Sequence, residues 1–295
     1  MPSPTKLGII RLIKQAVDEM PAISPVFNKL TEMSRNLETD ANELVKLIML
    51  DPVLSAKVLK LINSAFYGMS QPVNSLTEAV IMLGVNTVKN LATCTAVLDR
   101  IVVGGRGMAL NPQEFWVHCL GTAVACRLLG KAQNVPDDEL ETHFLAGLLH
   151  DLGKVILLKA IPGDYEIAMS RSAATSTSLN LAEMECFGFD HAQVGRLLAN
   201  RWKLTPSLVD AIENHHLPDT GARPPLTQRV IAANNLCKKL PLGQSGNTVI
   251  EPSAAAVAES LQIQPQILQD ITLRMPQELD KAMKFLKIQK KPASQ

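Results

Sequence analysis

The side chains best suited to chemistry in this chain are its histidines, all six of which lie beyond residue 117. In GLLHDLGK, His150 and Asp151 stand side by side in a predicted apolar helix, with Lys154 close behind. A carboxylate is costly to bury there unless it is paired or bound to a cation. Imidazole and carboxylate ligands suit Fe, Mn, Zn or Ni, so the dipeptide indicates a metal site. A hydrogen-bonded His beside an interhelical Asp explains it equally well.

Four other histidines occur in motifs that allow both interpretations. Glu114 and His118 are spaced i, i+4 and so share a helix face, as metal ligands or as part of a surface ion pair. His191 follows an aspartate near a predicted helix start, where an N-cap is a sufficient explanation. His215 and His216 end a predicted helix, and neighbours on a helix point about 100° apart, so each could reach a different ion. His143 lies outside these motifs and is predicted to be a core or supporting residue.

The elements that must position these residues are helices, because apolar side chains recur at helical spacing almost everywhere. Helix starts are marked by Asp40 with Glu43, by Asp51 before a proline, and by Ser75 with Glu78. The sequence therefore predicts an all-α fold.

A glycine-rich stretch without periodicity, residues 103–112, predicts a joint with a boundary near Gly107. The expected parts are an N-terminal helical subdomain, a helical core with all the histidines, and C-terminal helices with a basic tail from Lys287: 1–107, 108–240 and 241–295. Two helices are expected to close the chain. The serine- and threonine-rich stretch from Ser170 predicts a loop.

Composition excludes more than it identifies. Lysine and arginine total 29 against 28 acidic residues, and aromatic residues are 4% of the chain. A net charge of +1 offers no field for nucleic acid or an anionic membrane. A helix-turn-helix around Gly84 would carry only Lys89 as a cation before Arg100, so nucleic acid is not the expected partner. Five cysteines without a C-x-x-C pair, no signal peptide and no membrane span predict a cytoplasmic protein.

The order of these motifs resembles a known superfamily. E-x-x-x-H, HD-x-G-K, DHAQVG and HH follow one another as in the HD superfamily of metal-dependent phosphohydrolases, and within it the HD-GYP phosphodiesterases. The segments DPVLSAKVLKLINSAFYG and VNSLTEAVIMLGVNTVKNL resemble the HDOD domain, an HD-related output domain of bacterial signalling proteins. This second likeness covers about residues 20–217 and implies a multi-helical HD-like fold with an N-terminal helical subdomain.

The likeness to HD enzymes implies one or two divalent ions and no organic cofactor. One ion would be held by His118, His150 and Asp151, and Asp151 would bridge to a second held by the remaining motif histidines: His191, His215 and His216. In an enzyme, Asp151 and Lys154 would be the catalytic residues, with Lys154 neutralising a substrate phosphate. Glu114 and Asn235 are further possible ligands.

The likeness to HDOD domains implies regulation without an established reaction. Asn235 stands where an HD-GYP enzyme has its last aspartate ligand, and the GYP signature is absent from LPDTGARPP. An amide oxygen is a weaker ligand than a carboxylate, so one metal position should be impaired. The leading hypothesis is therefore a signalling output module, rather than an enzyme, that binds a partner protein or a small ligand. The alternative is a metal-dependent phosphohydrolase.

Overall fold

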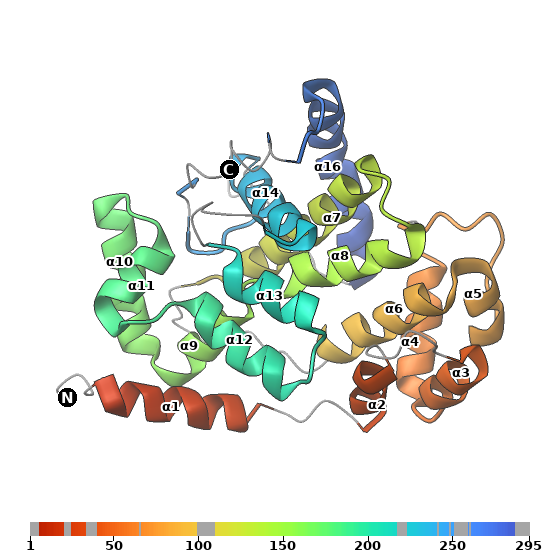
Figure 1. Cartoon of the computed structure of the whole chain (residues 1–295), viewed down its shortest axis with the longest axis horizontal. Helices are drawn as coiled ribbons and strands as arrows, with labels where there is room; N and C mark the ends of the chain where they lie inside the picture. Colours follow the sequence, from red (N-terminus) through yellow and green to blue (C-terminus); the bar gives the residue numbers. More distant parts are fainter. Residues whose placement is uncertain are drawn as a thin grey trace.

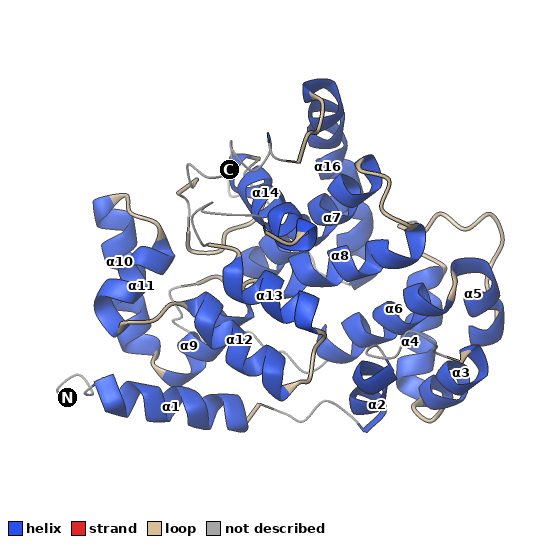
Figure 2. Ribbon diagram, viewed as in Figure 1, coloured by secondary structure: helices blue, strands red, loops and turns tan. Residues whose placement is uncertain are grey.

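All regular structure in the described part of the chain is helical, and no strand occurs there (Figure 2). The computed structural model describes residues 6–20, 25–33, 40–64, 66–98, 110–216, 223–240, 242–247, 249–250, 259 and 261–286. The predicted all-α class is confirmed. None of the described helices combines the length and the apolarity needed to cross a membrane.

Five short helices pack on one another at the right of Figure 1 and form what we call the N-terminal cluster. They are α2 (Pro25–Met33), α3 (Ala41–Met49), α4 (Pro52–Ile62), α5 (Leu76–Leu83) and α6 (Val85–Leu98). The predicted helix starts are confirmed, since the side chains of Asp40 and Ser75 accept hydrogen bonds from backbone N–H groups of the first turns of α3 and α5. A buried contact joins the cluster to the rest of the chain: the Tyr67 hydroxyl donates to Glu141 over 2.8 Å, and Arg127 donates to the other carboxylate oxygen over 3.0 Å.

The first helix, α1 (Lys6–Asp18), lies apart from the N-terminal cluster and packs on α9 and α12 of the second half (Figure 1). Its apolar stripe, which includes Ile9 and Ile13, is buried. The guanidinium of Arg201 donates to the carbonyl oxygen of Asp18 over 2.6 Å. By its contacts α1 therefore belongs with the core helices. The predicted boundary near Gly107 lies outside the described residues, and the three-part division stays a prediction.

The centre of the molecule is the 21-residue helix α7 (Pro112–Ala132), which is buried around most of its circumference. It packs against α8 (Asp137–Leu149), α14 (Pro225–Lys239) and α16 (Pro265–Leu286). A helix that is apolar on all sides must be enclosed by others, which explains its place. Of the two predicted closing helices, α16 is observed, and the tail from Lys287 lies outside the described residues.

The remaining helices are α9 (Leu152–Ala160), α10 (Pro162–Thr175), α11 (Leu179–Phe187), α12 (His191–Arg201) and α13 (Pro206–Asn214). The loop predicted from Ser170 is wrong, because α10 continues to Thr175. A close crossing of α9 and α12 depends on Gly153, since a Cβ atom at this position would collide with the carbonyl group of His191. This crossing places the start of α9 against the start of α12.

Candidate metal centre

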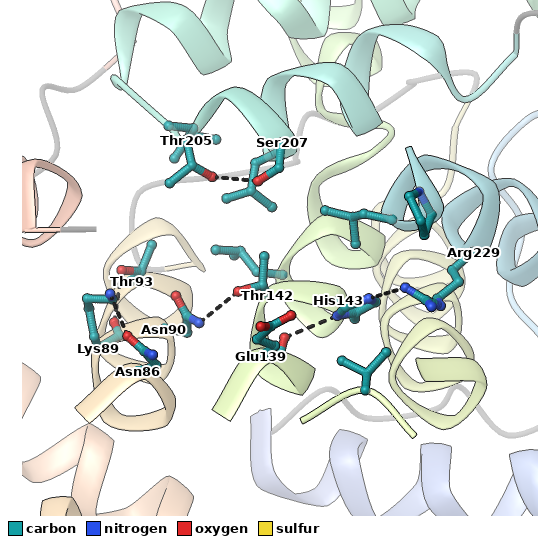
Figure 3. Close-up of a pocket in the computed structure, with 16 residues that line it drawn as sticks. Asn86, Lys89, Asn90, Thr93, Glu139, Thr142, His143, Thr205, Ser207 and Arg229 are labelled. Carbon is teal, nitrogen blue, oxygen red and sulfur yellow. Dashed lines mark hydrogen bonds between the residues drawn. The ribbon is translucent and has the colours of Figure 1, made fainter. Parts of the chain in front are cut away.

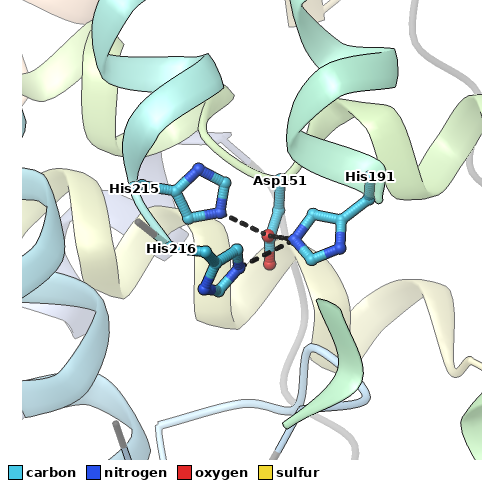
Figure 4. A group of neighbouring side chains, drawn as sticks. All are labelled: Asp151, His191, His215 and His216. Carbon is cyan, nitrogen blue, oxygen red and sulfur yellow. Dashed lines mark hydrogen bonds and ion pairs between the residues drawn. The ribbon is translucent and has the colours of Figure 1, made fainter. Parts of the chain in front are cut away.

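All but one of the motif residues converge from helix ends that are distant in sequence, and Figure 4 draws four of them. His150 and Asp151 occupy the junction between α8 and α9, so the apolar stretch GLLHDLGK is divided between two helices, as the alternative of an interhelical aspartate expects. His191 is the first residue of α12, behind an Asp190 capping box as expected. His215 and His216 directly follow α13, and His118 reaches the same place from the middle of α7. We call this group of five histidines and Asp151 the metal centre.

Three nitrogen atoms face oxygen Oδ2 of Asp151. The Nε2 atoms of His118 and His150 lie 3.9 and 3.4 Å from it, and Lys154 Nζ donates a hydrogen bond over 2.7 Å. The lysine ammonium thus already occupies the oxygen that the first predicted ion would use. A cation at this position would face a positive charge on the same carboxylate oxygen.

The other carboxylate oxygen, Oδ1, faces the remaining histidines. The Nε2 atoms of His191 and His215 lie 3.2 and 3.5 Å from Asp151 Oδ1. His216 completes the group, because its Nε2 atom lies 2.9 Å from that of His191 (Figure 4). The structure therefore brings together both predicted ligand sets, with Asp151 common to the two.

Backbone carbonyls determine which ring nitrogens point inward. The Nδ1 atom of His150 lies 2.7 Å from the carbonyl oxygen of Gly147, and that of His215 lies 2.8 Å from the carbonyl oxygen of Ile212. A carbonyl oxygen only accepts, so each Nδ1 carries a proton and each Nε2 is the nitrogen left to face Asp151.

Buried polar atoms in proteins nearly always have a partner, yet four atoms of the metal centre have none. The Nε2 atoms of His118, His150 and His215, and Oδ1 of Asp151, form no hydrogen bond in the described part of the chain. The Nε2 atoms of His118 and His150 face Oδ2 of Asp151, and that of His215 faces Oδ1, so nitrogen and oxygen ligands meet at two positions where a cation would be coordinated. The donor set fits a divalent transition metal.

Glu183, on α11, supports the metal centre from outside, and the sequence analysis missed it. One carboxylate oxygen accepts from the backbone N–H of His191 over 2.8 Å and from its Nδ1 over 2.6 Å. The other accepts from the Tyr165 hydroxyl over 2.9 Å. A carboxylate on the second nitrogen of a histidine fixes the ring and raises its basicity. The available signal was a charged residue within the largely apolar stretch LNLAEM.

Burial and charge set different protonation states within this group. Burial lowers the pKa of His118 to about 3 and that of His150 well below its usual value. Burial also acts to lower the pKa of His191, but Glu183 outweighs it and raises this pKa to about 9. For Asp151 burial opposes ionisation, but the neighbouring histidines as a group, together with Lys154, hold its pKa well below its usual range. Because His150 is itself neutral, Lys154 and protonated His191 are the positive neighbours of this carboxylate.

A loop of residues 242–247, the closing loop, packs on α7 beside the metal centre. Gly243 has φ +73° and packs so closely on the backbone of Glu114 and His118 that a Cβ atom would collide there. The carbonyl oxygen of Ser245 accepts from Lys154 Nζ over 3.0 Å. Lys154 is 1% exposed and is thus sealed beneath this loop.

The other predicted residues lie outside the two ligand groups. Glu114, half-buried, contributes its carbonyl oxygen to a hydrogen bond with the closing loop. The amide nitrogen of Asn235 donates to the Ile231 carbonyl over 3.0 Å, whereas Asn234 interacts with His118. His143 points elsewhere, its Nε2 atom lying 2.8 Å from a guanidinium nitrogen of Arg229.

Comparison with known proteins agrees with this architecture. The model of the HDOD domain matches residues 20–218. An uncharacterised protein of Treponema pallidum (strain Nichols) is 26% identical over 208 residues, which are 69% of this chain. The chain spans only 39% of the length of that relative.

Similar structures cover nearly the whole chain. An HDOD domain protein of unknown function from Geobacter sulfurreducens is 25% identical, with a TM-score of 0.77 over 95% of this chain and 98% of the other. A presumed phosphohydrolase from Shewanella amazonensis SB2B is also 25% identical, with a TM-score of 0.71 over 94% and 97%. A presumed signal transduction protein from Marinobacter aquaeolei VT8 is 19% identical, with a TM-score of 0.71 over 97% and 66%, and shares the fold.

Proposed function

Because the chain belongs to the HDOD domain family, with the all-helical HD-like fold, we propose that it is a regulatory module of bacterial signal transduction. In this role it binds a partner protein or a small ligand and carries a metal ion in its His/Asp centre. The observation that carries the metal part is the set of buried, unpartnered atoms directed at one another around Asp151.

The two oxygens of Asp151 are not equivalent as ligands. Lys154 already donates to Oδ2, and the neighbouring His118 contacts the neutral side chain of Asn234. Around Oδ1 the ring of His191 is backed by Glu183, which raises its basicity as a ligand. The Oδ1 position, with His191, His215 and His216, is therefore the stronger site, and the Oδ2 position is the impaired one.

Lys154 also favours regulation over catalysis. A lysine that neutralises a substrate phosphate must reach the substrate, but this one is buried and donates to Asp151 and to the closing loop.

Nucleic acid is an unfavourable partner because the cation that would contact its phosphates is buried. Lys89, the cation of the suspected recognition helix α6, is 6% exposed.

Metal content of protein purified without a histidine tag tests the proposal. After incubation with Zn²⁺, Mn²⁺, Fe²⁺ or Ni²⁺ and gel filtration, about one ion per chain is expected by mass spectrometry. Asp151→Ala should lose it, while Asp164→Ala, a change at an acidic residue of α10 that belongs to neither ligand group, should retain it. A metal-free wild-type protein, or equal loading of both variants, would refute the metal centre.

A metal-dependent phosphohydrolase is the second candidate, favoured by the complete set of five histidines around Asp151 and by the similarity to the presumed Shewanella phosphohydrolase. An ion held there would supply an acidified water as nucleophile. Bis(p-nitrophenyl) phosphate distinguishes the candidates, because the regulatory proposal expects no hydrolysis by the metal-loaded protein. Hydrolysis that Asp151→Ala abolishes would establish the enzyme instead.

A further inference from the structure

A second polar site lies between the N-terminal cluster and the core, away from the metal centre (Figure 3). It is a cavity of about 650 Å³, which we call the interhelical pocket, lined by α6 on one side and by α8, α13 and α14 on the other. Ligand pockets of proteins commonly measure roughly 300–1,000 Å³. None of the residues of the metal centre lines this cavity.

The wall of the interhelical pocket contains a buried guanidinium with neutral partners. Arg229, 9% exposed, donates from Nε to the amide oxygen of Gln133 over 2.6 Å and from Nη1 to His143 Nε2 over 2.8 Å. His143 is the neutral acceptor, because its Nδ1 lies 3.1 Å from the Glu139 carbonyl oxygen and therefore carries the proton. Burial lowers the pKa of His143 and so favours this neutral form.

No carboxylate of the described residues forms an ion pair with Arg229. Burial lowers the pKa of its guanidinium, and Cys126 and Glu139, whose exposed side chain also lines the pocket, only partly offset that effect. A buried charge is normally compensated by an opposite charge. The missing counter-charge beside an open cavity points to an anionic ligand.

The opposite wall adds a second cation and neutral hydrogen-bonding groups. Lys89 of α6 is 6% exposed, and its ammonium donates to Asn86 over 2.9 Å. Asn90 donates to Thr142 of α8 across the pocket over 3.0 Å, so polar groups of both halves meet here (Figure 3). Arginine and lysine bind phosphate, and amides and hydroxyls bind a sugar or a base edge.

We propose that the interhelical pocket binds a phosphate-bearing small molecule of mononucleotide size, with Arg229 on the phosphate. The inference rests on the ligand-responsive part of the proposed function but not on the metal centre. The position of the pocket also connects ligand binding to the metal centre. The ligand would contact α6 of the N-terminal cluster together with α8, and α8 ends at His150 of the metal centre.

Isothermal titration calorimetry with AMP, with inorganic phosphate and with adenosine tests this pocket. Saturable binding of one AMP per chain is expected, with weaker binding of phosphate and none of adenosine. Arg229→Gln and Lys89→Gln should each weaken AMP binding at least about tenfold, the value of one lost charge-assisted contact. Arg171→Gln, which removes an exposed arginine of α10 outside the pocket, should leave it unchanged.

Because Arg229→Gln could destabilise the fold, Ser207→Trp provides a second variant. Ser207 lines the pocket but is exposed, so a large side chain there should block entry without removing a buried contact. Absence of saturable AMP binding to the wild type, or unchanged affinity in folded Ser207→Trp, overturns the proposal. Loss of AMP binding in Asp151→Asn would place the phosphate at the metal centre and also overturns it.

Metal analysis of the same samples separates the two proposals. AMP binding by a protein without metal would support the pocket and defeat the metal centre. A full metal load without AMP binding would support the metal centre and defeat the pocket.

Discussion

Glu183→Gln is the most informative single change, because it keeps the size of the side chain and removes the charge behind His191. The carboxylate holds the imidazole Nδ1 over 2.6 Å and the backbone N–H over 2.8 Å. Loss of such a supporting carboxylate typically weakens metal binding about 10- to 100-fold, or roughly 1.4–2.7 kcal/mol. Loss of hydrogen bonds to a charged group should also lower the free energy of unfolding by about 1.5–3 kcal/mol.

Competition with a fluorescent chelator measures the Zn²⁺ affinity of the folded variant directly. The matched control is Glu185→Gln, two residues further along α11, where an exposed carboxylate pairs with Arg171. Tyr165→Phe should have an intermediate effect, since the tyrosine hydroxyl donates to the other oxygen of Glu183. An affinity of Glu183→Gln within about twofold of the wild type, in protein with native circular dichroism, would refute a supporting role for this residue.

Three further predictions follow from the same structure. Gly153→Ala should lower the free energy of unfolding by about 1–3 kcal/mol, because the added Cβ would collide with the His191 carbonyl group. The control, Gly163→Ala, should change it little, because a Cβ there meets nothing within 4 Å. Equal urea midpoints for the two variants would contradict this. The apparent Zn²⁺ affinity should rise about tenfold per pH unit from pH 6 to 8, because the pKa of His191 in the metal-free protein is raised to about 9 and binding at Nε2 must displace that proton. An affinity independent of pH in this range would show that His191 is not a ligand. Tyr67→Phe should lower the free energy of unfolding by about 1–3 kcal/mol, because buried Glu141 loses a hydrogen-bond donor. A change below about 0.5 kcal/mol would show that this contact does not stabilise the docking of the N-terminal cluster.

Helix type and several helix starts could be predicted because they depend on local signals. Asp40, Asp51 and Ser75 cap their helices through bonds to residues two or three positions ahead, which a sequence displays. The grouping of the motif histidines around Asp151 was implied by the order of the motifs, not by local chemistry.

Other features depend on contacts between distant segments. The helix break at His150 and Asp151 accompanies the crossing of α9 and α12 at Gly153, which periodicity does not reveal. Glu183 reaches His191 because α11 turns back on α12. In an enzyme Lys154 would neutralise a substrate phosphate, but its observed contact with the carbonyl oxygen of Ser245, 91 residues away in sequence, is one that no local pattern indicates.

Anomalous diffraction tests the central claim most directly. For crystals of untagged protein soaked in Zn²⁺, anomalous data are collected at wavelengths above and below the zinc absorption edge. The difference between the two maps should show a peak about 2.0–2.2 Å from Asp151 Oδ1 and from the Nε2 atoms of His191 and His215. Glu183→Gln crystals should show the same peak at lower occupancy. A wild-type map without zinc at Asp151, with the five histidines arranged as described, would contradict the metal centre.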